Sequence, residues 1–264
     1  MNIQKILITS DDGYNSLGVR VLAHILKDDY QLKIAGTLDQ MSGVGGKLSL
    51  SGGKFSNSTV DGVEAICVEG TPVDAVEVAN SYYQDTFDMV ISGINWGQNV
   101  GGSVVSSGTV SAALRALATN VAPKAIALSW KIPAKHWVKR HQSNESIEKF
   151  LEYPGVQAKK CIQEAIKNDM WGSDMLNINF PSTTTTQAVF TQPLYNQGKY
   201  YAPIHLDFDT SKFSYPMNYN PSKETDIQYD LVALEAGLIS ITPFKGTYLN
   251  EEVWHKISQQ KIAI

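Results

Sequence analysis

Cysteine is scarce in this sequence, because its 264 residues contain only Cys67 and Cys161. One cysteine lies in a strand-like segment and the other in a helix-like segment, so we expect two small buried side chains. A disulfide or a cysteine metal site is the less favoured alternative. The five histidines show no His-x-x-x-His spacing. We expect them at the surface or in the core, with His136, His141 and His205 in loops near a site as the alternative.

Long apolar runs and blocks of like charge are also absent. No run approaches the roughly 18 apolar residues that span a bilayer, and no leader-like segment precedes the first predicted strand. The formal net charge is −4, without the basic face that binds duplex nucleic acid. We therefore expect a cytoplasmic protein with neither a membrane nor duplex nucleic acid as partner. If it handles phosphates, positive charge must come from a metal or from helix amides.

The pattern of strands and helices predicts an α/β fold. Strand and helix signals alternate at short intervals through the first half, which indicates a mostly parallel, Rossmann-like sheet with helices on both faces. We expect this core to cover residues 1–181. Residues 182–264 are rich in threonine, aromatic residues and proline, and predict a β-hairpin region and arm that complete the same single domain. The length fits one large domain.

Individual elements follow from the spacing of apolar residues. Short apolar runs predict strands at 5–9, 32–35, 63–68, 88–92, 125–129, 175–179 and 238–242. Helical spacing predicts helices at 18–27, 107–118, 156–167 and 251–257. Thr71 and Pro72 have the residue types of a helix N-cap and first helical position. Residues 42–62 predict a loop and a hairpin at the sheet edge, residues 133–145 predict a loop, and Pro243 is expected to end the last strand.

Two adjacent carboxylates, Asp11 and Asp12, follow the first predicted strand. Parallel sheets bind ligands at the carboxyl ends of their strands. Neighbouring negative charges repel each other unless a cation lies between them, and oxygen ligands favour Mg²⁺ or Mn²⁺ over zinc. The alternative is a polar Asp-Asp-Gly turn. The pair lacks the Asp-x-Asp spacing of phosphatases that form an aspartyl-phosphate.

Two further segments carry residues suited to a phosphate or metal site. Asn95 and Asn99 lie in the glycine-rich segment 93–103, where glycine lets the backbone approach a ligand closely and the amide oxygen is a hard metal ligand. A mobile surface loop is the alternative. The segment 107–109, Ser-Gly-Thr, begins a predicted helix and has the features of an anion site, with ordinary N-capping as the alternative. The Gly-Val-Gly-Gly sequence at 43–46 lacks the spacing of a dinucleotide loop.

Several motifs occur in order along nearly the whole chain. They are Thr9-Ser-Asp-Asp-Gly13, Ser42-Gly43, Gly70-Thr-Pro-Val-Asp74, Ser92-Gly-Ile-Asn95 with Gly97 and Asn99, Ser107-Gly-Thr-Val110 with Ala112-Ala113, Asn177-Ile-Asn-Phe-Pro181, Thr225-Asp226 and Ser240-Ile-Thr-Pro243. With these motifs the chain resembles the SurE family of metal-dependent nucleotidases. The block from Ser92 to Val110 is the most specific part of the resemblance.

The resemblance implies a mechanism and a set of site residues. One divalent ion, Mg²⁺ or Mn²⁺, would be held by Asp11, Asp12, Ser42 and Asn95. Phosphate would be held by Asn99, Ser107, Gly108 and Thr109, and the catalytic residues would be Asp11, Asp12 and Asn99. The family removes phosphate from nucleoside 5′- and 3′-monophosphates, and some members trim polyphosphate. It also forms homodimers or homotetramers that exchange a C-terminal arm.

The chain departs from the family pattern at several positions. Ser10 stands where the family usually has Asn, Ser106 replaces Tyr, Ala75 replaces Cys, and Arg115 replaces Glu. These departures leave two alternatives to a nucleotidase. One is a nucleotide- or metal-binding protein that lacks catalysis, and the other is a phosphatase for a non-nucleotide monoester, with a pocket formed by residues 195–219.

Overall fold

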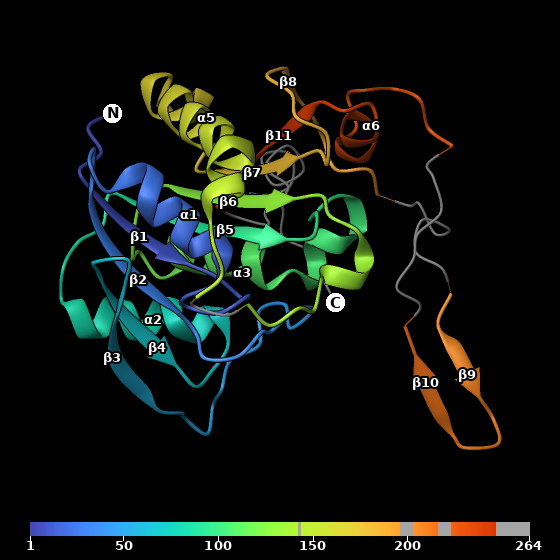
Figure 1. Cartoon of the computed structure of the whole chain (residues 1–264), viewed down its shortest axis with the longest axis horizontal. Helices are drawn as coiled ribbons and strands as arrows, with labels where there is room; N and C mark the ends of the chain where they lie inside the picture. The colour runs from blue at the N-terminus through green and yellow to red at the C-terminus, as the bar shows by residue number, and fades with distance from the viewer. Residues whose placement is uncertain (142–143, 196–202, 216–222, 247–264) are drawn as a thin grey trace, which may run out of the picture.

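The computed structural model describes residues 1–141, 144–195, 203–215 and 223–246 (Figure 1). Most of its strands belong to one sheet. They are β1 (Lys5–Thr9), β2 (Gln31–Thr37), β3 (Phe55–Val60), β4 (Val63–Val68), β5 (Met89–Trp96), β6 (Ala125–Trp130), β7 (Met175–Phe180), β8 (Ala188–Phe190) and β11 (Ile239–Phe244). A separate hairpin consists of β9 (His205–Asp207) and β10 (Lys212–Ser214).

Over the described residues, the large sheet has nine strands in the order β3-β4-β2-β1-β5-β6-β7-β11-β8. Every neighbouring pair from β4 to β7 is parallel. The edge strand β3 runs antiparallel to β4, and β11 runs antiparallel to β7. The expected mostly parallel sheet and the edge hairpin are confirmed. Because β11 and β8 join this sheet, part of the chain after residue 181 is continuous with the first half.

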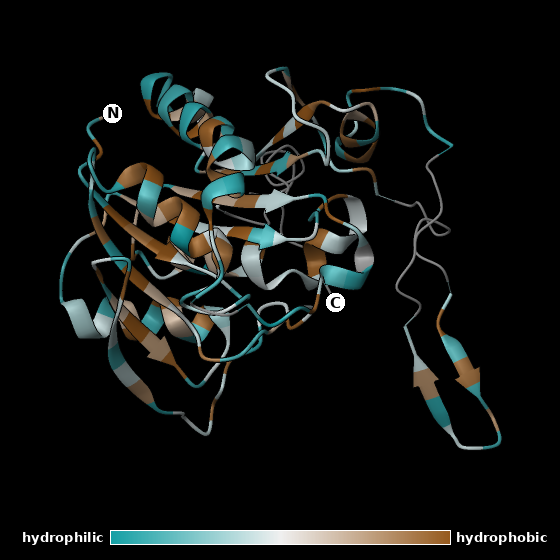
Figure 2. Ribbon diagram, viewed as in Figure 1, coloured by the Kyte–Doolittle hydropathy of each residue, from teal (hydrophilic) through white to brown (hydrophobic). Residues whose placement is uncertain are grey.

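Four longer helices cover the sheet, two on each face. They are α1 (Leu17–Leu26) and α5 (Val156–Lys167) on one face, and α2 (Pro72–Tyr83) and α3 (Gly108–Ala118) on the other (Figure 1). Side chains of β1 alternate between these faces: Ile6 and Ile8 pack toward α1 and α5, whereas Leu7 packs toward α2 and α3. This alternation follows from strand geometry. Figure 2 shows the hydrophobic residues along the central strands.

Shorter helices lie in the connections. They are η1 (Gly101–Ser106), η2 (Ala134–His136), α4 (Glu148–Phe150), η3 (Leu151–Gly155), η4 (Asp169–Gly172) and α6 (Asp230–Glu235). The expected N-cap of α2 is confirmed, because the Thr71 Oγ1 accepts the Asp74 N–H at 3.3 Å. The Asp74 carboxylate accepts the Thr71 N–H at 2.8 Å in return. The hydroxyl of Thr71 therefore begins α2 through a reciprocal capping box.

Two local expectations were wrong. Asn95 lies in β5, which extends to Trp96, although the glycines predicted a loop there. The pairing with β6 shifts register between Ser92 and Asn95, so the strand continues beyond the shift in an irregular form. Pro243 does not end β11. Since β8 pairs only with residues 239–241 of that strand, one side of β11 is open at Pro243 and tolerates a missing N–H.

The remaining expectations concern cysteines, membrane spans and the tail. Cys67 and Cys161 are free, the first buried and the second half-buried. Within the described ranges, no helix has the length and apolar character that crossing a membrane requires. The helix expected at residues 251–257 lies outside the described residues.

The strand order reverses direction between β1 and β5, which makes the carboxyl ends of these two strands a topological switch point. These strands are neighbours in the sheet. The helix that follows β1 covers one face, and the helix that follows β5 covers the other. Such a switch point is where open α/β sheets bind ligands.

Candidate active site

Asp11 and Asp12 follow β1 at this end of the sheet, and both are almost fully buried. The Asp11 Oδ1 accepts a hydrogen bond from the Thr109 hydroxyl at 2.7 Å. The Asp12 Oδ2 accepts the backbone N–H of Trp96 at 2.8 Å. The Asp12 N–H donates to the Ser10 hydroxyl at 3.1 Å. The carboxylates are therefore held by residues of β5 and the first turn of α3, and Ser10 fixes the backbone between them.

The start of α3 lies directly against Asp11. A Cβ added to Gly108 would lie 2.8 Å from the Asp11 Oδ2 and 3.0 Å from the Asp11 Cβ. Glycine therefore leaves room for the Asp11 carboxylate, and any larger residue would push that carboxylate out of its position.

Burial of the two carboxylates has an electrostatic cost. Burial raises the pKa of Asp11, and the hydrogen bond from Thr109 lowers it in part. Burial also raises the pKa of Asp12 well above its ordinary value, and the neighbouring charge of Asp11 raises it further. The hydrogen bonds from Trp96 and Gln40 oppose this rise. Two buried, adjacent carboxylates are therefore costly to keep charged, and a bound cation between them would lower that cost.

Among the described residues, two buried oxygen atoms of this site have no hydrogen-bond partner: the Asp12 Oδ1 and the Asn95 Oδ1. The orientation of Asn95 is fixed, because its Nδ2 donates to the Gly97 carbonyl oxygen at 2.7 Å. Buried polar atoms without partners are uncommon and costly. Two carboxylates and an amide oxygen are a suitable donor set for Mg²⁺ or Mn²⁺. The side chains of Asp11, Asp12 and Asn95 therefore fit a hard divalent ion.

The chemistry of this donor set differs from that of a carboxylate- or histidine-rich metal site. Across the described residues, no group of three or more His, Cys, Asp or Glu side chains is placed to hold a metal. The expected set contains only two such residues, and its other donors are neutral.

Ser42, the remaining expected ligand, is exposed in the loop after β2. Its hydroxyl donates to the Trp137 carbonyl oxygen at 3.3 Å and accepts from the Gln40 side-chain amide. The same loop is tied to the aspartates, because the Met41 N–H donates to the Asp11 carbonyl oxygen at 2.7 Å. The structure thus brings the Ser42 loop to the site with its hydroxyl bonded elsewhere, and a ligand role for Ser42 stays a prediction.

Asn99 is held by a buried polar scaffold. Its Nδ2 donates to the Ser129 hydroxyl at 2.8 Å, and its N–H donates to the Asn179 Oδ1 at 2.8 Å. Its carbonyl oxygen accepts from the side chains of Asn177 and Asn179. Sequence reasoning assigned no role to these two asparagines. The available signal was their period-two spacing in an otherwise apolar strand, which places both on one face of β7.

Both hydroxyl groups at the start of α3, which we expected to bind phosphate, already have hydrogen-bond partners within the protein. The Ser107 hydroxyl accepts the Val110 N–H at 3.0 Å, as an N-cap does. The Thr109 hydroxyl donates to Asp11. An anion at this helix would therefore meet mainly the backbone of its first turn, and the phosphate roles of residues 107–109 stay predictions.

Asp230 is a further residue that sequence reasoning missed. Its fully buried carboxylate accepts backbone N–H groups of Gly101 at 2.7 Å, Leu194 at 3.0 Å and Leu231 at 2.7 Å. Burial raises its pKa, and these backbone hydrogen bonds lower it in part. Asp226, in the expected Thr-Asp landmark, is exposed instead. Asp230 therefore anchors the glycine-rich segment that contains Asn99.

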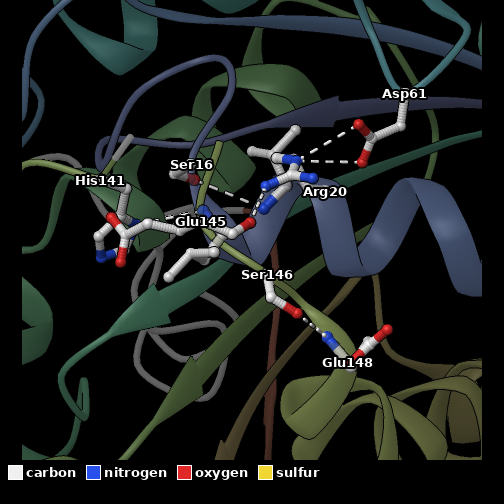
Figure 3. Close-up of polar contacts among 9 residues, drawn as sticks. Ser16, Arg20, Asp61, His141, Glu145, Ser146 and Glu148 are labelled. Carbon is white, nitrogen blue, oxygen red and sulfur yellow. Dashed lines mark hydrogen bonds and ion pairs between the residues drawn. The ribbon is translucent and has the colours of Figure 1, made fainter. Parts of the chain in front are cut away.

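The connection after β6 runs beside this site and is tied to α1 (Figure 3). The His141 Nδ1 accepts the Leu17 N–H at 3.2 Å. Arg20 pairs with Asp61 and donates to the Glu145 carbonyl oxygen at 2.5 Å. Burial lowers the pKa of His141 to about 4, so this imidazole is neutral near pH 7.

Comparisons with known proteins show which family this chain resembles. The family model described as "Survival protein SurE" matches residues 6–200. The 5′-nucleotidase SurE of Methanopyrus kandleri is 36% identical over 180 residues, which are 67% of this chain and 66%, just under two thirds, of that protein. The 5′-nucleotidase SurE of Nitratiruptor sp. is 30% identical over 261 residues, covering 92% of this chain and 94% of that protein.

A solved structure shares the fold. The crystal structure of the SurE protein from Aquifex aeolicus has a TM-score of 0.73 and 22% sequence identity, and covers 96% of this chain and 98% of that chain. The family match, the full-length relative and the buried aspartate pair after β1 lead to one assignment: this chain belongs to the SurE family.

Proposed function

We propose that this chain is a phosphomonoesterase that uses a divalent metal ion to remove phosphate from nucleoside 5′-monophosphates. The observation that carries the proposal is the buried Asp11–Asp12 pair after β1, together with the side-chain oxygens of Asp12 and Asn95 that have no hydrogen-bond partner among the described residues. The names of the relatives in Methanopyrus kandleri and Nitratiruptor sp., 5′-nucleotidase SurE, supply the substrate class.

Each residue of the site has a definable task. Asp11, Asp12 and Asn95 would hold the ion, with Ser42 as a further ligand once its hydroxyl leaves the Trp137 carbonyl. When bound, a divalent ion supplies Lewis acidity toward the phosphate ester and acidifies water. The backbone of the first turn of α3 stabilises negative charge on the phosphoryl oxygens. The scaffold of Asn177, Asn179 and Ser129 keeps Asn99 in place.

The finer points of the activity are also proposals. We extend the substrates to nucleoside 3′-monophosphates and polyphosphate on the family resemblance alone. Mg²⁺ and Mn²⁺ are the ions that the oxygen donors favour. A cytoplasmic location, with no membrane and no duplex nucleic acid as partner, stays a prediction from the sequence.

The test is a phosphate-release assay on a substrate panel with Mg²⁺ or Mn²⁺, with and without chelator. The panel contains nucleoside 5′- and 3′-monophosphates, sugar phosphates and polyphosphate. We expect metal-dependent release from 5′-monophosphates, and loss of release in Asp11→Asn and Asp12→Asn with little change in folding. Normal turnover by both variants would refute the site. Binding of nucleotides without turnover would support the binding-protein alternative, and preference for sugar phosphates would support the non-nucleotide phosphatase.

We further propose a homodimer or homotetramer assembled by a C-terminal arm. The hairpin of β9 and β10 extends away from the sheet (Figure 1). It exposes large apolar side chains, with Phe208 85% and Phe213 65% exposed, and exposed apolar patches mark contact surfaces. Light scattering should show a dimer or tetramer that dissociates in a Phe208→Asp, Phe213→Asp double variant. A wild-type monomer would contradict this assembly.

A further inference from the structure

A cavity of about 690 Å³ lies between the ends of β5 and β6 and the connection that follows β6. Its inner walls are aromatic. Trp96 and Trp130 are neighbours across the strands, with ring centroids 5.9 Å apart. The ring of Phe150 lies 5.2 Å from Trp96 and 5.7 Å from Trp130. The three rings meet edge to face, a favourable aromatic arrangement.

Apart from Ile132 and Pro133, the cavity's other lining residues are polar and include both charges. The Lys139 Nζ lies 5.8 Å from the centre of the Trp96 ring and 2.6 Å from a carboxylate oxygen of Glu145. The Lys149 Nζ lies 4.7 Å from the centre of the Phe150 ring. Apolar walls with a few polar groups are the usual lining of small-molecule sites, and the volume lies within their usual range of about 300–1,000 Å³.

Trp96 joins this cavity to the aspartate pair. Its backbone N–H donates to the Asp12 Oδ2 at 2.8 Å, while its side chain lines the cavity. Trp96 also follows Asn95 directly in β5, and successive side chains of a strand point to opposite faces. The Asn95 side chain therefore lies on the side of β5 that faces the proposed metal site, and the Trp96 ring lies on the other side and lines the cavity.

The connection after β6 borders both places. Its Trp137 carbonyl accepts from the Ser42 hydroxyl, and a Cβ on Gly97 would lie 3.1 Å from the Trp137 ring. His136 and Lys139 of the same connection line the cavity. The hydrogen bonds of His141 and Glu145 to α1 fix this wall in place (Figure 3).

We propose that this cavity is the subsite for the nucleobase of the substrate. The inference rests on the proposed nucleotidase function, because a phosphate ester bound at Asp12 would have the rest of the molecule beside Trp96. Purine and pyrimidine rings present π-faces that stack on tryptophan. The lysines, glutamates and His136 around the cavity are suited to hydrogen bonds with the polar edge of a base.

The test compares AMP with glycerol phosphate, which has no ring. Ser146 lines the cavity and is exposed, so Ser146→Phe fills it without removing a core side chain. Trp130→Leu removes a wall. Ser56→Phe, on the exposed edge strand β3, is the matched control. We expect Ser146→Phe and Trp130→Leu to raise the KM for AMP about tenfold more than the KM for glycerol phosphate, the scale of a lost stacking contact. Ser56→Phe should alter neither.

Equal changes for both substrates in Ser146→Phe, or no change, would overturn the base subsite and leave the nucleotidase function standing. Quenching of tryptophan fluorescence by adenosine tests the cavity apart from catalysis. If the wild type releases no phosphate from AMP but adenosine binds, with about tenfold weaker binding in Ser146→Phe, the function fails and the cavity assignment stands. If adenosine does not bind to the wild type, the cavity assignment fails.

Discussion

Gly108→Ala tests whether catalysis depends on the position of Asp11. Gly108 begins α3, and its φ angle is not positive. Alanine therefore suits the backbone, and helix propensity favours it by up to about 1 kcal/mol. The added Cβ would lie 2.8 Å from the Asp11 Oδ2 and 3.0 Å from the Pro72 Cγ, whereas 3.4–4 Å is ordinary contact. Asp11 must therefore shift by roughly 0.5–1 Å to relieve the overlap.

The expected loss is larger for activity than for stability. A shift of about 1 Å in a catalytic group costs on the order of 100-fold in rate, or about 2.7 kcal/mol of activation free energy. Overpacking costs about 1–3 kcal/mol of unfolding free energy, which helix propensity offsets in part. We expect Gly108→Ala to lose about 100-fold in kcat/KM for AMP while the free energy of unfolding falls by no more than about 2 kcal/mol. Phosphate release and urea unfolding measure the two quantities.

Gly102→Ala is the matched control, because it lies in the neighbouring glycine-rich segment and its added Cβ would meet nothing within 4 Å. It should keep activity within about twofold, since no contact with the carboxylates changes. The reasoning is refuted if folded Gly108→Ala retains wild-type activity, or if Gly102→Ala loses as much.

Three further predictions concern stability. Asp230→Ala leaves three buried backbone N–H groups without their acceptor, so urea unfolding should show a loss of about 3–5 kcal/mol; a loss below about 1 kcal/mol would contradict the anchoring role. His141 has a folded pKa of about 4 against 6.5 for the free side chain, so between these values the unfolded chain binds more protons. Its contribution is complete above pH 6.5 and is lost as the pH falls to 4, by roughly 3 kcal/mol; His141→Gln should flatten the pH profile, and a flat wild-type profile would exclude this effect. Gly18→Ala would place a Cβ 1.9 Å from the Ile94 carbonyl oxygen, a backbone collision that should cost more than about 3 kcal/mol, whereas a stable variant would show that α1 can move away from β5.

The sequence predicted the parts of the fold that local periodicity determines. The apolar run Ile6–Ile8 is buried on both faces of the sheet, as an unbroken run predicts. Asn95 was misplaced because glycine usually indicates a loop, whereas here Gly93 permits a close pass of β5 to β6: its added Cβ would lie 2.3 Å from the Leu128 carbonyl oxygen. That contact joins separate strands, so no local pattern reveals it.

The candidate site was predictable in its residue types and less so in their contacts. The Asp-Asp pair and Asn95 were proposed from their residue types, because carboxylates after a buried strand and a nearby amide oxygen suit a hard metal ion. The engagement of the Thr109 hydroxyl with Asp11 was not, since it depends on how α3 meets β1. Asp230 was overlooked for a related reason: the three N–H groups that it accepts include two that are distant in sequence.

Calorimetric titration with Mn²⁺ is the most direct test of the claim that Asp11, Asp12 and Asn95 hold one divalent ion. We predict one Mn²⁺ per wild-type chain, at least about tenfold weaker binding in Asp12→Asn, and unchanged binding in Asp226→Asn, which alters an exposed carboxylate. Equal binding of Mn²⁺ by the wild type and Asp12→Asn, or no binding by the wild type, would contradict the account.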